Sequence, residues 1–217
     1  MGTVKARHQP LVFLTSNDQR ELSDALKRRH WGELMKVTGK TWDMDGFNFK
    51  LKVLLDADLP RYVEDIEEIT EGADKQLAIE RKLNEIRERW AVEEFEFGEG
   101  SRKCPLLMGI PPIIEELEEA QMNLQTMLSM RHVTPFREEV ASKLKQLSDT
   151  SETLERWLKV QMLWCSLESV FTGGDIAKQM PREAKKFAKV DKDWFKVMAK
   201  AIEERNIVNM CNNELLL

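Results

Sequence analysis

The tripeptide Gly39-Lys40-Thr41 could belong to a nucleotide site, because Gly-Lys-Ser/Thr ends a phosphate-binding P-loop. A P-loop also needs a glycine five residues before Gly39 and a strand-to-helix turn whose backbone N–H groups face the phosphates. Leu34 stands at that position, and the preceding segment has the spacing of an amphipathic helix rather than of a buried strand. A helix that stops at Gly39 and continues into a loop accounts for the glycine. We therefore predict a helix end here and no bound cofactor.

Candidate metal ligands do not have the spacing that a metal site requires. Asp43, Asp45 and Gly46 faintly resemble a calcium-binding loop, but that register puts Lys52 where a bidentate glutamate belongs, and a lysine repels the cation. The histidines are far apart and lack cysteine or carboxylate partners at ligand spacing; they are His8, His30 and His132. We expect no metal site, and we interpret His30, beside Trp31, as a packed or hydrogen-bonded structural side chain.

Catalytic patterns are also missing from the sequence. No serine lies in a GxSxG turn, and no cysteine has a recognisable histidine partner. Cys104, Cys165 and Cys211 are far apart without a CxxC motif, which is typical of reduced thiols that act as small core residues. The acidic runs at 64–68 and 115–119 suit the first turns of helices, where carboxylates interact favourably with the helix dipole. We predict no catalytic residues in this chain.

Composition limits the classes of partner. Of the 217 residues, 42% are hydrophobic and 33% charged, with only 10 Gly and 7 Pro, so helix should dominate. The net charge of -5 argues against general nucleic-acid binding. The polar start lacks a signal peptide, and no run of 18 apolar residues could span a membrane. Both ends of the sequence suggest a piece of a longer chain.

Hydrophobic spacing predicts a mainly α fold, an elongated antiparallel bundle or stack of helices with one small β-hairpin, treated as one unit over residues 1–217. We expect amino-terminal helices within 1–56, a long helix over 58–90, a hairpin near 93–108, and helices over 111–131, 135–171 and 181–205. Asp58 should cap the long helix, with Pro60 in its first turn and a kink near Gly72.

The helix over 135–171 carries the longest hydrophobic pattern. Steps of four and three continue through Val140, Leu144, Leu147, Ser151, Leu154, Leu158, Gln161 and Cys165, with Trp157, Trp164 and Leu167 on the flank. After it, eight basic residues are interleaved with Glu183, Asp191 and Asp193: Lys178, Arg182, Lys185, Lys186, Lys189, Lys192, Lys196 and Lys200. They form either a plain solvated face or a surface for an acidic partner.

Several blocks of this sequence resemble the linker region of dynein heavy chains, the segment between the tail and the AAA+ ring. They are RHWGELMKVTG, LLDADLPRYVEDIEEI, KLNEIRERWAVEEFEF, LQTMLSMRHVTPFREEV, LERWLKVQMLWCSLESVF and DIAKQMPREAKKFAKVDKDWFKVM. Their order is similar to the family from about Leu22 to Met198, and the texture is closer to axonemal, outer-arm heavy chains than to the cytoplasmic form. Met162, Cys165 and Met180 depart from the family pattern as tolerable core exchanges.

The resemblance implies residues with structural rather than catalytic roles. The structural family motif comprises His30, Trp31, Leu34, Trp90, Pro135, Phe136, Trp157, Leu158, Gln161, Trp164, Leu167 and Trp194. Chain breaks supply the hinge candidates Thr134, Gly173 and Gly174.

The resemblance also implies a function. The family's linker is a helical lever that bends and straightens as the ring hydrolyses ATP, and this segment matches its tail-proximal part, which carries no Walker motif. We therefore expect a non-catalytic lever segment of a microtubule motor in the cytoskeleton of a ciliary or flagellar axoneme. The implied partners are the ring and tail of the same heavy chain and other dynein subunits. Microtubules would be involved only indirectly, and nucleic acid and membrane not at all. The alternative is a helical interaction module that docks other dynein or axonemal subunits.

Overall fold

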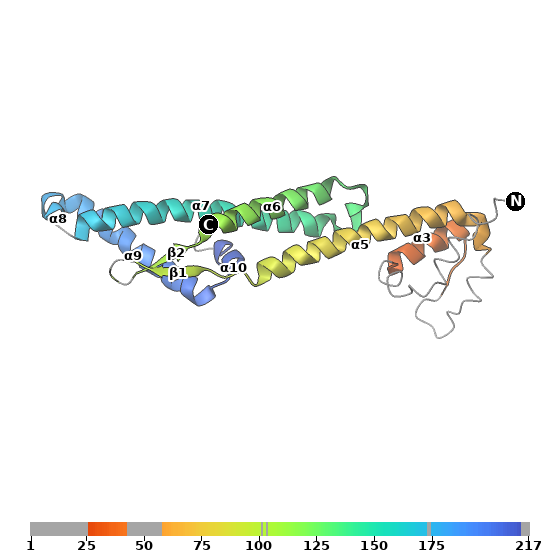
Figure 1. Cartoon of the computed structure of the whole chain (residues 1–217), viewed down its shortest axis with the longest axis horizontal. Coiled ribbons are helices and arrows are strands. Elements are labelled where there is room, and N and C mark those ends of the chain that lie inside the picture. Colours follow the sequence, from red (N-terminus) through yellow and green to blue (C-terminus); the bar gives the residue numbers. More distant parts are fainter. Residues whose placement is uncertain (1–25, 43–57, 101, 103, 173–174, 214–217) are drawn as a thin grey trace. The chain divides into compact units, whose positions relative to one another are not determined.

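The computed structural model describes residues 26–42, 58–100, 102, 104–172 and 175–213. Most of these residues are helical, and a single two-stranded hairpin interrupts the helices among them, so the predicted mainly α class with a small hairpin is confirmed (Figure 1). The chain divides into two compact units, one from Met1–Lys82 with Arg131–Thr134 and one from Leu83–Met130 with Pro135–Leu217.

The first unit contains helix α3 (Arg28–Thr38), a short 3₁₀ helix (η1, Leu59–Tyr62) and the start of helix α5 (Val63–Ala91). Its buried cluster comprises Leu34, Leu59 and Ile66, against which Trp31, Trp42, Tyr62 and Ile69 pack. α5 is helical without interruption through Gly72. The helix expected upstream of α3 lies outside the described residues.

His30 is the buried polar residue of α3 that links it to α5. The backbone N–H of Lys27 donates to Nδ1 of His30 at 3.0 Å, so the ring hydrogen is on Nε2 and points at Oε1 of Gln76, 2.9 Å away. Nε of Arg29 donates to the same amide oxygen at 2.6 Å. The interpretation of His30 as a packed, hydrogen-bonded side chain is confirmed.

Two helix ends of the first unit were predicted, and one prediction is wrong. Gly39 ends α3 with φ of 66°, a left-handed conformation that glycine adopts without strain, so the predicted helix stop is confirmed. Asp58 makes no side-chain capping hydrogen bond; its carboxylate instead lies 2.5 Å from Nε of Arg61. Pro60 follows in a 3₁₀ turn, so the α-helix begins only at Val63.

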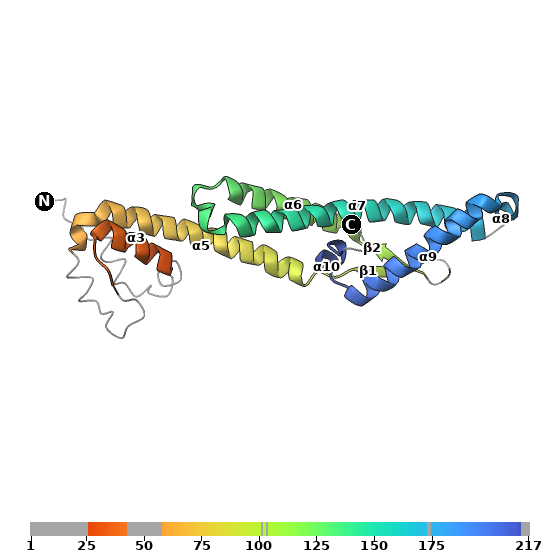
Figure 2. The ribbon, with the colours of Figure 1, turned by 180° about the vertical axis from the view of Figure 1, so that it is seen from behind.

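The second unit is built on the antiparallel pair α6 (Ile110–Ser129) and α7 (Arg137–Thr172). A 3₁₀ turn, Arg131–Phe136, connects them. Figures 1 and 2 show α6 lying beside the first half of α7. Their shared core is apolar, and its fully buried residues include Ile110, Leu117, Leu124, Val140, Leu147 and Leu154.

A hairpin and a returning helix cover the other half of α7. β1 (Glu96–Glu99) pairs antiparallel with β2 (Pro105–Met108), with Phe97 opposite Leu107. After the one-turn α8 (Ile176–Gln179), α9 (Pro181–Glu204) runs back toward the hairpin (Figure 2), and α10 (Ile207–Cys211) follows. The prediction had no counterpart to α10.

Asn206 attaches α10 to the end of α5. Its Oδ1 caps α10 by accepting from the N–H of Asn209 at 2.9 Å. Its Nδ2 donates to the carbonyls of Ala91 and Glu93 at 3.0 and 3.2 Å. Those carbonyls lie at and just beyond the last turn of α5, where backbone acceptors lack helical partners. One side chain therefore satisfies backbone groups of two segments that are distant in sequence.

Candidate functional site

α7 changes the face that it buries halfway along its length. The buried seam includes Val140, Leu147, Ser151 and Leu154, as the heptad predicts, and then shifts to Trp157, Trp164 and Glu168. The shift occurs where the neighbour of α7 changes from α6 to the hairpin and α9. Trp157 and Trp164 therefore lie in the seam rather than on its flank, whereas Leu158 and Cys165 are only half-buried.

Gln161 connects this second half of α7 to the edge of β2. Its Oε1 accepts from the N–H of Leu107 at 2.8 Å, and its Nε2 donates to the C=O of Leu107 at 3.0 Å. Both backbone groups of Leu107 therefore point away from β1, although Leu107 is opposite Phe97 in the register. The side-chain amide takes the place of a third strand and covers a sheet edge that would otherwise be unpaired.

Arg102, in the hairpin loop, bridges α7 and α9. Its Nε donates to Oε1 of Glu168 at 2.8 Å, and its Nη2 and Nη1 donate to Asp191 at 2.6 and 3.3 Å. These bonds, that to Asp191 foremost, raise the already high pKa of Arg102 against the opposing effect of burial. Glu168 is one of the few buried charged residues in the described chain, and Arg102 supplies the opposite charge that such burial requires. The guanidinium also lies 5.8 Å from the ring centroid of Trp164.

Aromatic pairs hold the same three elements together. Trp164 and Trp194 stack with centroids 5.3 Å apart, and Nε1 of Trp164 donates to Oδ1 of Asp191 at 3.0 Å. Phe95, just before β1, meets Trp157 edge to face at 5.4 Å. Large rigid rings resist sliding of one element over another, and here the indole N–H of Trp164 also has a hydrogen-bond acceptor. We call this set of contacts among α7, the hairpin and α9 the junction.

Burial makes the thiols of the three cysteines less acidic. Burial raises the pKa of the Cys104 thiol, although the neighbouring Trp194 indole and Arg102 lower it in part. Burial also raises the pKa of Cys165, and it raises the pKa of Cys211 to about 12. The thiols are therefore protonated at neutral pH, as the interpretation of small core residues expects.

The structure brings together some members of the predicted structural family motif and leaves others apart. Trp157, Gln161, Trp164 and Trp194 meet at the junction, with Leu158 half-buried beside them. Three members lie in the first unit (His30, Trp31 and Leu34), while Trp90 is buried near the end of α5 and Phe136 at the end of the 3₁₀ turn before α7. Pro135 is exposed, and Leu167 is 43% exposed and takes no part in the junction.

Sequence reasoning missed the polar residues that complete the junction. Arg102 belongs to a predicted turn and Asp191 to a charged stretch, and neither position follows a hydrophobic period. A signal existed for Glu168, since it continues the row Trp157, Gln161, Trp164 at a spacing of four. Among the hinge candidates, Thr134 is the last residue of Arg131–Thr134, the short segment that belongs to the first unit. Gly173 and Gly174 lie outside the described residues.

The described ranges contain no group of three or more His, Cys, Asp or Glu side chains arranged to hold a metal ion. Nor does any helix in them combine the length and the apolar character needed to cross a bilayer. What the described geometry offers is a set of polar and aromatic contacts that joins α7, the hairpin and α9.

Comparison with known proteins identifies the family of this chain. Residues 20–217 match the family described as dynein heavy chain, N-terminal region 2. The chain is 41% identical over 196 residues to the dynein gamma chain of the flagellar outer arm of Chlamydomonas reinhardtii, covering 88% of this chain and 4% of that one. It is 39% identical over 205 residues to human dynein axonemal heavy chain 8, covering 93% and 4%. It is 37% identical over 195 residues to the dynein-1-alpha heavy chain of the C. reinhardtii flagellar inner arm I1 complex, covering 87% and 4%. The chain thus spans only a small part of these relatives' length.

Proposed function

We propose that this chain, which belongs to the dynein heavy chain family, is a non-catalytic lever segment of a microtubule motor. In this role it transmits ATP-driven changes of an AAA+ ring that lies outside this chain. The ATPase activity would belong to the complete heavy chain. Because the relatives' names place them in axonemes and flagellar arms, the proposed location is a ciliary or flagellar axoneme.

The observation that carries the proposal is the continuity of α7 and its attachment at the junction. α7 has 36 residues, which corresponds to about 54 Å at a rise of ~1.5 Å per residue. Over its second half, Gln161 and Trp164 attach it to the hairpin and to α9. A long helix that is attached on its side, rather than only at its ends, transmits force with little bending. This is the property that a lever needs.

A hinge at Thr134-Pro135 fits the same role. The boundary between the two compact units runs between these residues, and it also falls between Lys82 and Leu83 inside α5. Proline fixes its own φ and restricts the preceding residue, so bending would be absorbed over a short stretch.

Distance measurements in the complete heavy chain test the lever. One fluorophore is attached at position 122 of α6, where Met122 is 64% exposed, and a second is attached to the AAA+ ring. The distance is expected to change between the nucleotide-free and ATP-bound states and to stay constant when hydrolysis and binding are blocked in the ring. A distance that is the same in every nucleotide state would rule out the lever.

A further inference from the structure

α9 presents a basic face opposite its buried face. Its members are Arg182, Lys185, Lys186, Lys189, Lys192, Lys196 and Lys200. At 3.6 residues per turn, their spacing places all of them within about a third of the helix circumference. The residues that bury the helix occupy the other side: Phe187, Trp194, Met198 and Ala201. The two faces of α9 are therefore chemically distinct over nearly its whole length.

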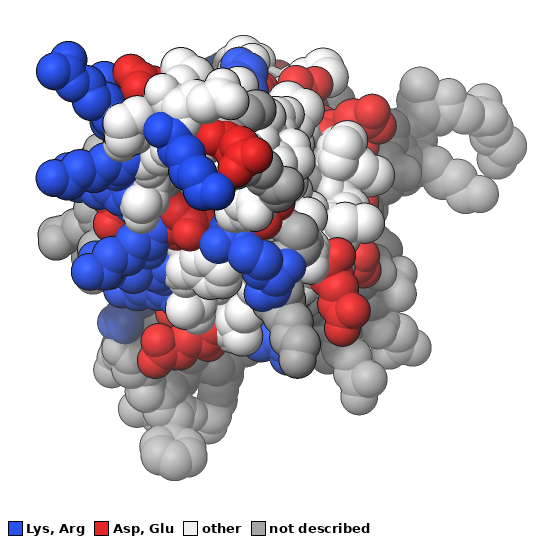
Figure 3. Space-filling model, turned by 90° about the vertical axis from the view of Figure 1, so that its left-hand side faces the viewer, with Lys and Arg blue, Asp and Glu red and all other residues white. Residues whose placement is uncertain are grey.

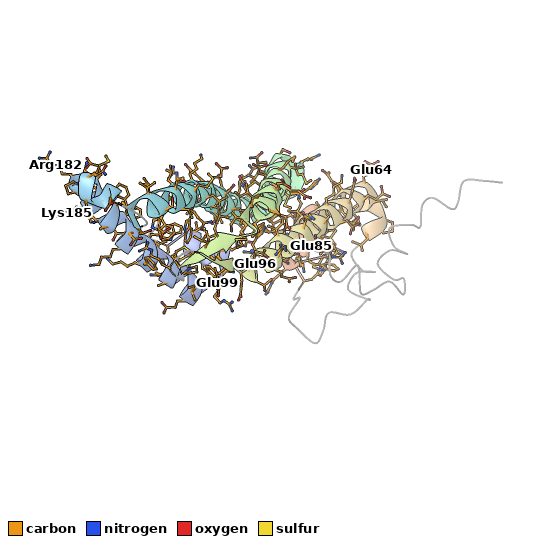
Figure 4. The ribbon with its side chains drawn as sticks, turned by 60° about the vertical axis from the view of Figure 1, so that its left-hand side comes forward. Glu64, Glu85, Glu96, Glu99, Arg182 and Lys185 are labelled. Atoms are coloured by element: carbon orange, nitrogen blue, oxygen red, sulfur yellow. The ribbon has the colours of Figure 1, made fainter. Side chains whose placement is uncertain are left out.

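Within the described part of the chain, most charges of this basic face have no ion-pair partner. The one ion pair found there for a member of the face joins Lys196 to Asp193 at 3.6 Å, and both side chains are exposed. Figure 3 looks onto the end of the second unit and shows Lys and Arg side chains gathered along one side. Figure 4 labels Arg182 and Lys185 on the outside of α9, where solvent surrounds them. The face is thus a concentrated positive surface in a chain whose net charge is -5.

An apolar groove runs along one border of the basic face, between α7 and α9. It has about 350 Å³ of free space and is lined by Thr153, Arg156, Trp157, Val160, Val190, Asp193, Trp194 and Val197. Trp157 and Trp194 are nearly buried and form its floor, whereas Val160 and Val190 are 46% and 48% exposed on its two walls. We call it the α7–α9 groove. Its size suits several apolar side chains at once.

Charge and apolar surface adjoin each other on the same helix. Lys186, Val190 and Val197 follow one row of α9, at steps of four and seven, so Lys186 stands at one end of the groove wall. The remaining basic residues lie on the neighbouring row. Asp193, the acidic residue in this wall, is partnered by Lys196. A ligand in the groove would therefore meet apolar side chains on its inner side and lysines along one flank.

The apolar surface continues beyond the groove along α7. Leu163 and Leu167 follow Val160 at steps of three and four and are 64% and 43% exposed. An exposed stripe with this period matches the contacts of a helix that packs lengthwise. Single exposed apolar residues need no explanation, but a periodic row that leads out of a groove is typical of a binding surface.

We propose that the α7–α9 groove and the basic face of α9 bind an acidic amphipathic helix of a partner protein. Its apolar residues, spaced i, i+3 or i+4 and i+7, would enter the groove against Trp157, Val190 and Val197. Its acidic residues would face Lys186 and Lys189, which favours association and sets the orientation of the bound helix. This inference goes beyond the lever role and does not depend on it.

The shape of the site favours a helix over other polyanions. The apolar residues lie in a groove between two helices, which the side chains of a helix can enter but the flat surface of a bilayer cannot. A nucleic acid would be attracted by the lysines, but the exposed valines of the groove offer no hydrogen bonds to phosphate or base. These two ligands are therefore tested as competing outcomes.

Synthetic peptides provide the test with the intact 217-residue chain. Each is about three heptads long with leucine at the a and d positions, and the flanking e and g positions are Glu, Gln or Lys in the three versions. Binding is measured by peptide fluorescence anisotropy and by the change in the total tryptophan emission of the chain, to which Trp157 and Trp194 contribute. We expect the Glu peptide to bind most tightly, the Gln peptide less tightly and the Lys peptide not at all, with the difference reduced by salt.

Matched variants locate the binding. Val190→Glu should lower the affinity for the Glu peptide by at least about tenfold, and Lys189→Glu should lower it by about fivefold, since ~1.4 kcal/mol of binding free energy corresponds to a factor of ten. The controls are Val92→Glu, at a valine that is 72% exposed outside the groove, and Lys159→Glu, at an exposed lysine of α7 that does not line it. Neither control should change the affinity. Circular dichroism verifies that each variant remains folded.

Three results would overturn the proposal. The first is equal binding, or no binding, of the Glu and Lys peptides. The second is an affinity that Val190→Glu and Val92→Glu change to the same extent, because the groove would then play no part. The third is binding of anionic lipid vesicles or of a mixed-sequence oligonucleotide that matches the Glu peptide and is lost with Lys189→Glu alone. That result would assign the basic face to a general polyanion.

Discussion

The side-chain amide of Gln161 in α7 forms hydrogen bonds with both the N–H and the C=O of Leu107 in β2, at 2.8 and 3.0 Å. A helix side chain thereby takes the place of a neighbouring strand. The two-stranded hairpin, which would be marginal alone, is held against the long helix through its own backbone. This pair fixes the position of the hairpin along α7.

Replacing Gln161 tests that attachment. Gln161→Ala leaves two backbone groups of Leu107 without partners, so we expect a loss of about 1–3 kcal/mol in the free energy of unfolding. Amide exchange at Leu107 should accelerate at the same time. Urea unfolding and hydrogen exchange measure the two effects, with Gln125→Ala on the exposed surface of α6 as the control. An unchanged exchange rate at Leu107 would refute the attachment.

Arg102 is expected to act through geometry as well as charge. Arg102→Lys keeps the charge but cannot bond Glu168 and Asp191 at once with a planar fork, so it should recover only part of what Arg102→Ala loses. We expect the alanine variant to lose about 1–2 kcal/mol of unfolding free energy, because the buried carboxylate of Glu168 loses the opposite charge of Arg102.

A surface pair provides the comparison for Arg102. Lys145 forms an exposed i,i+4 pair with Asp149 at 2.6 Å, so Lys145→Ala should cost no more than about 0.5 kcal/mol. If Arg102→Ala and Lys145→Ala have the same effect in urea unfolding, Arg102 does not hold the junction together.

Two tryptophans of α7 provide a matched test of hydrogen bonding. Nε1 of Trp164 donates to Asp191, whereas Nε1 of Trp157 is buried without a hydrogen-bond partner in the described structure. Trp164→Phe should therefore destabilise more than Trp157→Phe, by about 1 kcal/mol in the free energy of unfolding. Thermal and urea unfolding measure both variants. The reverse order would show that ring volume, and not the bond to Asp191, determines the contribution of Trp164.

The two glycines of α3 should respond to alanine in opposite directions. Gly39 has φ of 66°, which alanine adopts only with strain, so Gly39→Ala should destabilise by about 1 kcal/mol. Gly32 lies inside the helix, and a Cβ there would meet nothing within 4 Å, so Gly32→Ala should stabilise by roughly 0.5–1 kcal/mol. Urea unfolding of the two variants and of the original chain measures both changes in the free energy of unfolding. A stabilising Gly39→Ala would contradict the helix stop.

Cys211 should make stability fall at high pH. Burial raises the pKa of its thiol from the ordinary value of 9.0 to about 12. Between these values the unfolded chain loses the proton and the folded chain keeps it. Unfolding then releases a proton, and stability decreases as pH rises, by about 1.4 kcal/mol per pH unit. Below pH 9 the thiol contributes no pH dependence.

Urea unfolding at several pH values measures this contribution. Between pH 8 and about pH 10.5, the free energy of unfolding of the original chain should fall by roughly 2 kcal/mol more than that of Cys211→Ala. Cys165→Ala, which removes a half-buried thiol, should keep most of the decline. Parallel pH profiles for the original chain and Cys211→Ala would contradict the raised pKa.

The helices and the hairpin could be predicted from the sequence because their signals are local. Hydrophobic steps of three and four mark one face of α7 up to Leu154, Gly39 allows a left-handed helix end, and Phe95 and Phe97 alternate beside a turn. Each of these features depends on residues within one or two turns of chain. The family resemblance likewise rested on blocks that can be recognised one at a time.

Only the tertiary structure decided which faces meet and which polar groups pair. The heptad alone predicts that Leu158 and Cys165 continue the buried seam, yet the hairpin and α9 approach from another side and bury Trp157 and Trp164 instead. Gln161 bonds to Leu107 across a separation of 54 residues in the sequence, and Arg102 bonds to Asp191 across 89 residues. No local spacing encodes such pairs, because their free energy arises only when the elements pack together and exclude water. The sequence by itself determined the family and most of the elements, but not α10. The packing of α7, the hairpin and α9 decided the junction and the groove.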